Sequence, residues 1–278
     1  MGANAWVVSN RLTGLAAAAF TWSAGANDAT RSRLCDGMMN QLYVNGAVVA
    51  SGINVVVDLG TALACTGAAA LNSNCAVQKT DAALRIRGAD NLAMTVNVVT
   101  AKAASTLNTA AMRNKDHVLQ FASVTKRYWE FLWTWTGNVL DFAVGELFLL
   151  NAQTTLARKS IYGAVEARDF RVSEVGHYNG SSTTYFEGGP LRSKRLPYSD
   201  MTSAELEGLF AIPDATKGGA KPFLWIESYE ATATAAAVDE QEVLYGKIGP
   251  AFEFSNPDYR LFTPNELVIK SLGRQVGA

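Results

Sequence analysis

The chain has 278 residues, of which 49% are apolar and 10% aromatic, and 24 Lys and Arg residues nearly balance 25 Asp and Glu residues. This balance excludes a nucleic-acid binder, which carries an excess of Lys and Arg over an extended surface. The apolar content excludes a disordered chain, and the length predicts two domains, at about 100–200 residues for each.

Strict alternation of apolar and polar residues dominates the first half of the chain. In residues 53–60 the side chains of Ile53, Val55, Val57 and Leu59 share one face, as in a strand with one side on a core. The same pattern predicts further strands at Leu84–Arg87, ended by Gly88, and at Met94–Val99 and Leu119–Val124.

An aromatic run follows at Tyr128–Trp135, where every second residue is Trp or Phe. A row of exposed aromatic rings stacks on sugars, but the alternation with Glu130 and Thr134 favours a core-facing ladder. Gly137-Asn138 predicts a turn, and Leu140–Leu150 supplies further strand material. Strands at this spacing, without helical segments between them, predict an antiparallel, jelly-roll-like β-sandwich.

The second half changes character after Ala157-Arg158-Lys159. Its clearest element is a helix that starts with a capping box, Thr202 to Glu205, and that Pro213 is expected to stop. Further strands are predicted at Pro222–Ile226, Val243–Gly246 and Glu266–Ile269. We therefore expect a mainly β protein, with a β-sandwich over residues 1–160 and a smaller β-rich domain with one short helix over residues 161–278.

Charged residues are few in the first hundred residues of the chain. Residues 1–100 contain six Lys and Arg and five Asp and Glu, which leaves eighteen and twenty for the rest. A surface of Ala, Val and Asn is typical of a subunit that its neighbours cover. The alternative is a well-buried β-domain whose uncharged polar surface consists of Asn, Ser and Thr.

Targeting signals are weak. The run Leu15–Phe20 and the small residues after it loosely mimic a signal peptide, but no positive residue precedes Arg11, so we expect an unprocessed, soluble chain. Asp141 and Glu146 interrupt the best candidate for a membrane span, Val139–Leu150. Three cysteines without a CxxC spacing predict buried free thiols and synthesis in a reducing cytoplasm; they are Cys35, Cys65 and Cys75.

Catalytic signatures are lacking. The two histidines, His117 and His177, exclude a His-rich metal site, and there is no GxSxG motif. Asp116 beside His117 is predicted to be a surface pair, because neighbours on a strand point to opposite faces. The Gly-rich Lys217–Lys221 lacks P-loop order, and the basic Arg192–Arg195 is predicted to be a solvated strand end or subunit contact. The sequence thus predicts no enzyme, no catalytic residue, no cofactor and no metal site.

Several short motifs resemble the galactose-binding-like (discoidin-type) β-sandwich domains of tailed-phage virion proteins, over roughly residues 5–150. They are Asn10-Arg11-Leu12, Arg33 to Gly37, Val57 to Gly60, Ala83 to Asp90, Arg127-Tyr128-Trp129 and Val144 to Leu147. The segments Phe186–Arg195, Pro222–Trp225 and Tyr245-Gly246, with the capped helix, are similar to β-rich domains of phage tail and baseplate subunits.

The resemblance implies a structural subunit of a virion tail, made in the host cytoplasm and assembled with copies of itself and with other tail or baseplate proteins. The alternative is a receptor-binding module that recognises cell-surface glycans, since discoidin-type modules bind ligands through loops at one end of the sandwich. Trp22 and Tyr178 are the candidate glycan contacts. An enzyme that cleaves polysaccharide ranks third, and no membrane span or nucleic-acid partner is expected.

Overall fold

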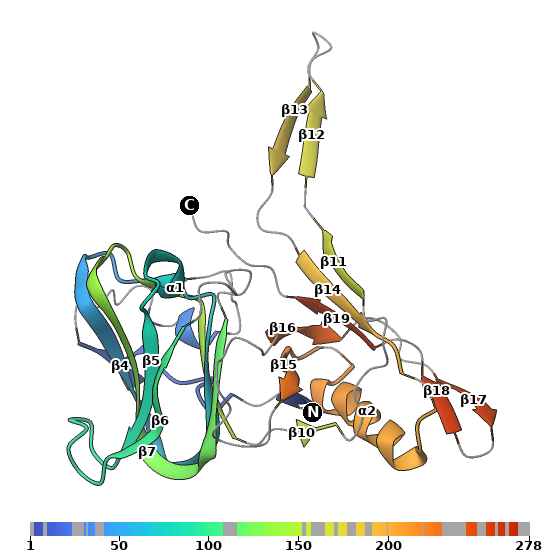
Figure 1. Cartoon of the computed structure of the whole chain (residues 1–278), viewed down its shortest axis with the longest axis horizontal. Coiled ribbons are helices and arrows are strands. Elements are labelled where there is room, and N and C mark those ends of the chain that lie inside the picture. The colour runs from blue at the N-terminus through green and yellow to red at the C-terminus, as the bar shows by residue number, and fades with distance from the viewer. Residues whose placement is uncertain are drawn as a thin grey trace. The chain divides into compact units, whose positions relative to one another are not determined.

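The computed structural model describes residues 3–7, 10–23, 31, 33–36, 42–107, 116–151, 154–156, 165–169, 172–176, 182–186, 191–198, 200–218, 220–229, 243–248, 254–258, 261–264 and 267–271. The chain forms two compact units, Met1–Thr155 with Ile226–Val243, and Leu156–Trp225 with Leu244–Ala278 (Figure 1). Residues 157–164 lie outside the described part of the chain, so the division at residue 160 stays a prediction.

Two long strands organise the first unit. β4 (Val49–Leu71) and β7 (His117–Val139) pair antiparallel along most of their length, within the sheet order β2-β4-β7-β5-β6. The other members of this sheet are β2 (Phe20–Trp22), β5 (Ala83–Ala89), β6 (Val99–Thr106) and β9 (Glu146–Leu150), the last of which pairs with β4.

β-bulges bend β4 and β7, so that each of these long strands contributes to both layers of the sandwich. The register between β4 and β7 shifts between Asp58 and Leu63, and a bulge bends the strand that carries it. Gly60, in the shifted stretch, has φ +76°, and its N–H donates to Asp58 Oδ1 at 2.7 Å. At a second shift, Gly52 has φ +142°, and a Cβ there would lie 2.5 Å from the Trp133 carbonyl oxygen. Glycine is therefore required at this close approach.

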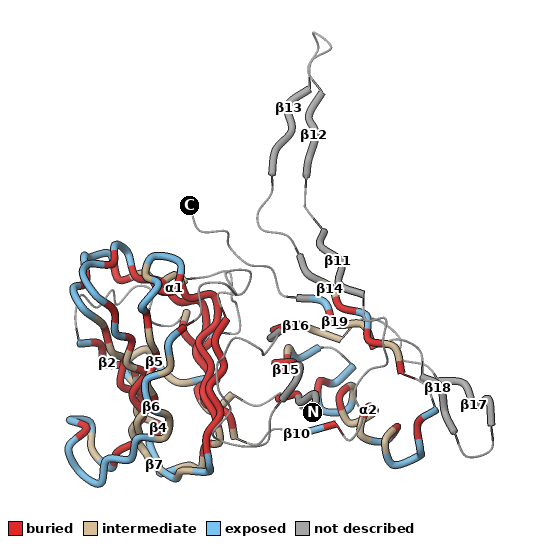
Figure 2. Tube along the Cα trace, in the orientation of Figure 1, coloured by how far each residue is buried: buried red, intermediate tan, exposed pale blue. Residues whose placement is uncertain are grey.

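The core of the sandwich takes side chains from both halves of each long strand (Figure 2). Val55, Val57, Cys65 and Ala68 of β4 belong to one buried cluster. The same cluster contains the inward-facing residues of β7, namely Leu119, Phe121, Trp129, Phe131, Trp133 and Trp135. The prediction that the aromatic run forms a core face is confirmed, as are the β-sandwich and the buried free cysteines.

Short elements close the unit. Asn10 fastens the N-terminal segment to β9, because its Nδ2 donates to the Leu147 carbonyl at 2.7 Å and its Oδ1 accepts from the Leu149 N–H at 3.1 Å. The remaining elements are β1 (Ala3–Val7), which pairs with β10 (Thr154–Thr155), β3 (Tyr43–Val44), which pairs with β8 (Ala143–Val144), the 3-10 turn η1 (Ala17–Ala19) and α1 (Cys75–Gln78).

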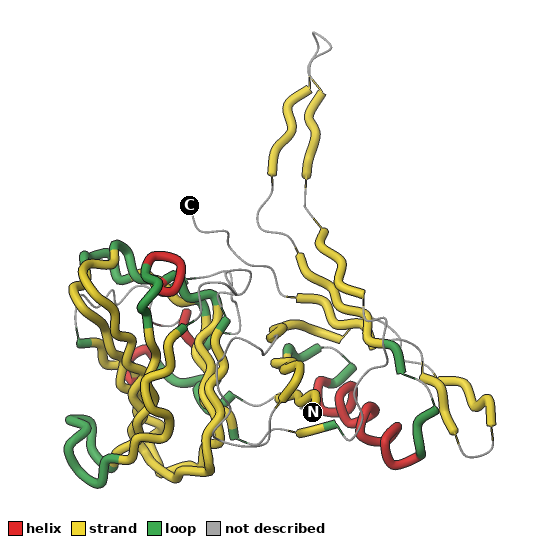
Figure 3. The backbone as a smooth tube through the Cα atoms, viewed as in Figure 1, coloured by secondary structure: helices red, strands yellow, loops and turns green. Residues whose placement is uncertain are grey.

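The second unit is also β-rich, with the helix α2 (Ser203–Thr216) beside its strands (Figure 3). Four of its strands lie in the order β16-β19-β14-β11. These are β16 (Val243–Ile248), β19 (Leu267–Ser271), β14 (Leu191–Leu196) and β11 (Val165–Asp169). β15 (Phe223–Tyr229) belongs to the second unit up to Trp225 and to the first unit from Ile226. Two hairpins complete the second unit, β12 (Val172–Gly176) with β13 (Ser182–Phe186), and β17 (Phe254–Asp258) with β18 (Leu261–Pro264).

The predicted capping box at the start of α2 is confirmed: the Thr202 side chain accepts from the Glu205 N–H, and Glu205 accepts from the Thr202 N–H at 2.8 Å. The predicted stop at Pro213 is wrong, since the helix continues to Thr216 and ends at Lys217 in the left-handed conformation. Pro213 removes one backbone donor but lies in the last turn, where Thr216 Oγ1 donates to the Ile212 carbonyl at 2.8 Å and helps to hold the helix end.

Two strand predictions differ from the structure. Met94 and Asn97 have φ of +54° and +47°, which a strand does not accommodate, so residues 90–98 form a loop and β6 begins only at Val99. β7 runs through the predicted turn at Gly137-Asn138, and the chain bends at Leu140-Asp141 instead.

The prediction of a surface pair at Asp116 and His117 is also wrong, because both residues are buried. Asp116 Oδ1 accepts the backbone N–H of Asn72 at 2.8 Å, just after β4 ends. This bond satisfies a donor at the end of the β4 ladder, which explains why a carboxylate is buried there.

Candidate functional site

The outer face of the sandwich sheet carries polar side chains where the inner face carries aromatic ones. Glu130 on β7 lies opposite Val56 on β4 and, on its other side, opposite Arg87 on β5. Because side chains on adjacent strands point to the same face when their residues are paired, these three form one row across the sheet. Asn54 lies two residues before Val56 and therefore on the same face.

Glu130 is the centre of a hydrogen-bonded network on this row. Arg87 donates to it twice, from Nε to Oε2 at 2.5 Å and from Nη2 to Oε1 at 2.9 Å, and Asn54 Nδ2 donates to Oε1 at 2.7 Å. Ser23 Oγ in turn accepts from the Asn54 backbone N–H at 3.1 Å. The Glu130 side chain is only 2% exposed and that of Arg87 25%. The paired groups are thereby held in fixed orientations.

The network keeps Glu130 ionised. Burial alone raises the pKa of this carboxyl group, and it is the largest single influence. Hydrogen bonds from Arg87 and Asn54, together with the positive charges of Arg87 and Arg85, outweigh it and lower the pKa below its ordinary value. The same pairing raises the pKa of Arg87.

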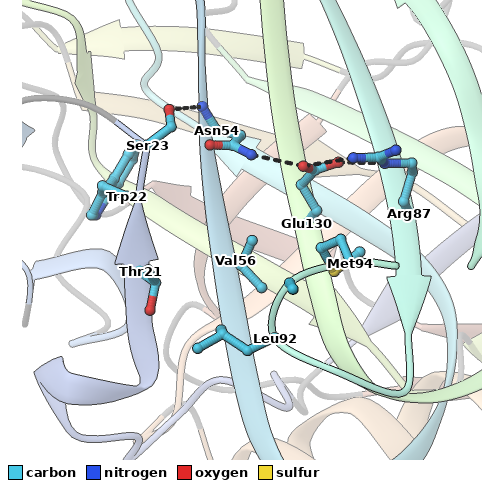
Figure 4. Close-up of a pocket in the computed structure, with 10 residues that line it drawn as sticks. Thr21, Trp22, Ser23, Asn54, Val56, Arg87, Leu92, Met94 and Glu130 are labelled. Atoms are coloured by element: carbon cyan, nitrogen blue, oxygen red, sulfur yellow. Dashed lines mark hydrogen bonds and ion pairs between the residues drawn. The ribbon is translucent and has the colours of Figure 1, made fainter. Parts of the chain in front are cut away.

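A pocket of about 360 Å³ opens on this network. In Figure 4 the side chains of Asn54, Glu130 and Arg87 follow one another across neighbouring strands. Of the residues from the loop after β5, Met94 lies just below Glu130 in this view, and Leu92 lies further down, near Val56. Val56, Leu92 and Met94 give the pocket an apolar wall; its remaining lining residues are Thr21, Trp22, Ser23 and Ala93. One wall therefore offers hydrogen-bonding groups and the other offers apolar contact.

The loop that supplies the apolar wall is held by its own side chains. Asn91 Oδ1 accepts the backbone N–H groups of Thr95 at 2.9 Å and Val96 at 3.0 Å, and Lys126 Nζ pairs with Asp90 Oδ1 at 2.9 Å. Met94 packs with Val56 and Ala89 in a small buried cluster. The loop thus fixes one side of the pocket before any ligand arrives.

The two predicted glycan contacts have different positions. Trp22 lines the pocket, but its side chain is 8% exposed and its ring stacks on Tyr43 at 4.1 Å, within the core. Tyr178 lies outside the described residues. Glycan contact by either residue stays a prediction.

Sequence reasoning missed Asn54, Arg87 and Glu130 as site residues. The pattern places Arg87 and Glu130 on outward faces, which is the available signal. It does not give the register that brings residues 54, 87 and 130 together, because these residues come from three strands far apart in the chain.

Other kinds of site are not seen in the described residues. Within them, no group of three or more His, Cys, Asp or Glu side chains lies close enough together to bind a metal ion. Within that same described part of the chain, no helix is long and apolar enough to cross a membrane.

The fold and the pocket define a mainly β protein whose β-sandwich carries a partly polar, partly apolar hollow on one sheet face. Comparison with protein-family models gives no match, and comparison with curated proteins gives none either. The solved structures that resemble the chain include several carbohydrate-binding modules, each of which covers about half of it.

Three of these structures illustrate the likeness. One is a chitosan-binding module derived from a chitosanase/glucanase of Paenibacillus sp. IK-5, with 15% identity and a TM-score of 0.38 over 51% of this chain and 98% of that one. Another is CpGH89CBM32-6 produced by Clostridium perfringens, with 14% identity and a TM-score of 0.36 over 52% and 100%. The third is the lectin domain of lectinolysin, complexed with Lewis B antigen, with 14% identity and a TM-score of 0.39 over 52% and 99%. At such values the likeness carries no argument about the ligand of this chain.

Proposed function

We propose that the sandwich is a non-catalytic module that binds a saccharide in the outer-face pocket. The observation that carries the proposal is the pairing of two unlike walls: Asn54, Glu130 and Arg87 on one side, and Val56 with Leu92 and Met94 on the other. A pyranose ring presents hydroxyl groups around its edge and C–H groups on its faces, so it is complementary to both walls.

The polar wall suits hydroxyl groups in particular. The Asn54 amide and the Arg87 guanidinium group donate to hydroxyl oxygens in fixed directions, and the buried Glu130 carboxylate, which accepts from both, orients them. Since the bonds among Asn54, Glu130 and Arg87 already hold these groups in place, little side-chain freedom is lost on binding. A volume of about 360 Å³ lies at the small end of ligand pockets, about 300–1,000 Å³, so we expect one or two sugar residues to occupy it.

Binding to a glycan array, followed by calorimetry with the retained sugars, tests the proposal. Asn54→Ala removes a donor to Glu130 and one polar contact of the pocket, and we expect affinity to fall about tenfold. Leu92→Ser shortens the apolar wall at a side chain that is 46% exposed, and a loss of about threefold is expected.

Asn138→Ala is the matched control, since Asn138 is an exposed asparagine further along β7 and away from the pocket lining. It should bind like the unaltered chain. Failure of every saccharide to bind, or equal binding by Asn54→Ala, Leu92→Ser and the control, would overturn the proposal.

A second candidate is a subunit of a phage virion tail, made in the host cytoplasm and assembled with copies of itself. It is favoured by the motif resemblance and by large apolar side chains exposed on the sandwich, namely Val48, Val77, Leu92, Val96, Val98, Val99 and Leu140. Sedimentation over a range of concentrations distinguishes the two. If the chain binds a saccharide, stays monomeric at every concentration and does not bind purified tail or baseplate proteins, the assembly role is contradicted.

A further inference from the structure

The end of the sandwich at which α1 lies exposes three large apolar side chains (Figure 1). They are Val48 with 58% of its surface exposed, Val77 with 44% and Leu140 with 60%. Single apolar residues on a surface are ordinary in soluble proteins, but a group of them on neighbouring segments marks an interaction surface. We call these three residues the end patch.

Hydrogen bonds tie together the segments that carry the end patch. Val48 comes just before the first residue pair between β4 and β7, and Leu140 just after it, so the two residues lie side by side. Gln78 of α1 bonds Leu140 twice, because its Nε2 donates to the Leu140 carbonyl at 2.8 Å and its Oε1 accepts the Leu140 N–H at 3.1 Å. Val77, the neighbour of Gln78, is thereby held beside the other two. A partner that contacts the patch orders little additional backbone.

Two charges of opposite sign flank the end patch. Asp141 lies at the start of α1, since Asn74, just before the helix, donates from Nδ2 to the Asp141 carbonyl at 2.9 Å. Lys79 follows the last residue of α1, and its Nζ lies near Gly137. Asp81 attracts Lys79 as well, but its carboxylate is held by a backbone N–H of β7. Within the described part of the chain, neither Lys79 nor Asp141 belongs to an ion pair.

We propose that the end patch is the interface of a symmetric dimer of this chain. In such an interface the same surface faces itself across a twofold axis. The apolar residues of the two copies then meet, and Lys79 of each copy meets Asp141 of the other, because the two charges lie at opposite ends of α1. The patch is thus complementary to itself in charge, whereas an anionic membrane or a strongly charged partner meets one attractive and one repulsive group.

The inference goes beyond both proposed functions, since it needs neither a saccharide nor a tail protein. Sedimentation velocity with the full chain, up to about 1 mM, tests it. Three apolar side chains from each copy form a small interface, so we expect a weak dimer with a Kd of about 100 μM. A chain that is monomeric at every concentration overturns the proposal.

Substitutions in the end patch test its apolar contacts. Leu140→Ser should weaken the dimer at least about tenfold, because each dimer loses two leucines from its interface. Val77→Ser should weaken it about fivefold. Val96→Ser is the matched control: Val96 is 48% exposed, like Val77, but lies in the loop at residues 90–98. Equal effects of Val77→Ser and Val96→Ser would place the contact elsewhere and overturn the proposal.

Charge reversals test the twofold arrangement. Lys79→Glu gives a chain with acidic groups at both ends of α1, and Asp141→Lys gives one with basic groups at both ends, so each should form a dimer about tenfold weaker than that of the unaltered chain. An equal mixture of the two variants should form mixed dimers with a Kd within about twofold of the original. Lysine fits at position 141, where φ is +47°, since Lys217 has φ +53°.

The results separate this proposal from saccharide binding. A mixture that associates no better than either variant alone overturns the twofold pairing of Lys79 with Asp141. None of the substituted residues lines the pocket, so sugar affinity should be the same in all these variants. A chain that stays monomeric but still binds a saccharide overturns the dimer alone.

Discussion

The two faces of β7 are the sharpest contrast in this molecule. Trp129, Phe131 and Trp133 alternate along the strand with Glu130 and Leu132, so residues that are adjacent in sequence lie in opposite environments. The inner face packs aromatic rings, with centroids 6.1 Å apart for Phe131 and Trp133. The outer face holds a carboxylate that depends on a few partners from neighbouring strands.

This contrast separates two kinds of specificity. The free energy gained by burying apolar area does not depend on the orientation of the groups, so many arrangements of large side chains stabilise the inner face. The outer network works only in one register, because Arg87 and Asn54 must reach the same carboxylate. Stability should therefore depend most on the inner face, and ligand binding on the outer one.

Trp133→Ala is the substitution with the largest expected effect. Trp133 is fully buried and lies 5.1 Å from Phe142 and 6.4 Å from Trp22, measured between ring centroids. Its truncation leaves a cavity in a close-packed core, and we expect a loss of about 3–5 kcal/mol in the free energy of unfolding. Urea unfolding, followed by circular dichroism, measures it.

Leu132→Ala is the matched control on the outer face of the same strand, where the side chain is half-buried. We expect it to cost only about 1 kcal/mol. An equal cost for both substitutions would mean that the two faces do not differ as the structure indicates.

Glu130→Gln has the next largest effect and should depend on pH. At neutral pH it replaces a charged acceptor of Arg87 by an amide, at a cost of about 2 kcal/mol. The pKa of Glu130 is lowered in the folded chain, so its carboxylate contributes stability above the ordinary value of 4.5, and this contribution is lost as pH falls through the folded pKa. The two proteins should therefore converge in acid.

Unfolding curves for both proteins between pH 7 and about pH 3 measure this convergence, because the other carboxylates contribute equally and cancel in the difference. A difference that stays constant over the range would show that the charge of Glu130 does not stabilise the fold.

The contrast also explains which features could be predicted from the sequence. The alternation of apolar and polar residues predicts the strand at Ile53–Gly60 and the core-facing aromatic residues from Trp129 to Trp135. This is possible because a strand with one side on the core has an apolar residue at every second position of a single segment. The capping box at Thr202 was equally local, since both partners lie within one turn of helix.

The pocket could not be predicted in this way. Asn54, Arg87 and Glu130 meet only through the registers of two strand pairs, and the bulges in β4 shift those registers. The strand prediction at Met94–Val99 rests on alternating apolar and polar residues, and it is wrong up to residue 98 because Asn91 provides local hydrogen bonds that compete with strand pairing. Side-chain capping of this kind leaves no periodic signal.

Asp58→Asn should have the smallest effect, although the pair that it alters has geometry as good as that of Glu130. Arg127 donates to Asp58 from Nε at 2.7 Å and from Nη2 at 2.8 Å, and this bonding is the main reason that the pKa of Asp58 is lowered. The side chains are 29% and 43% exposed, however, so water screens the attraction. An asparagine also keeps the oxygen that accepts the Gly60 N–H. We expect a change of at most about 0.5 kcal/mol, which added salt reduces further, in the same urea experiment. A cost as large as that of Glu130→Gln would show that bond geometry, and not burial, decides the strength of these outer-face pairs.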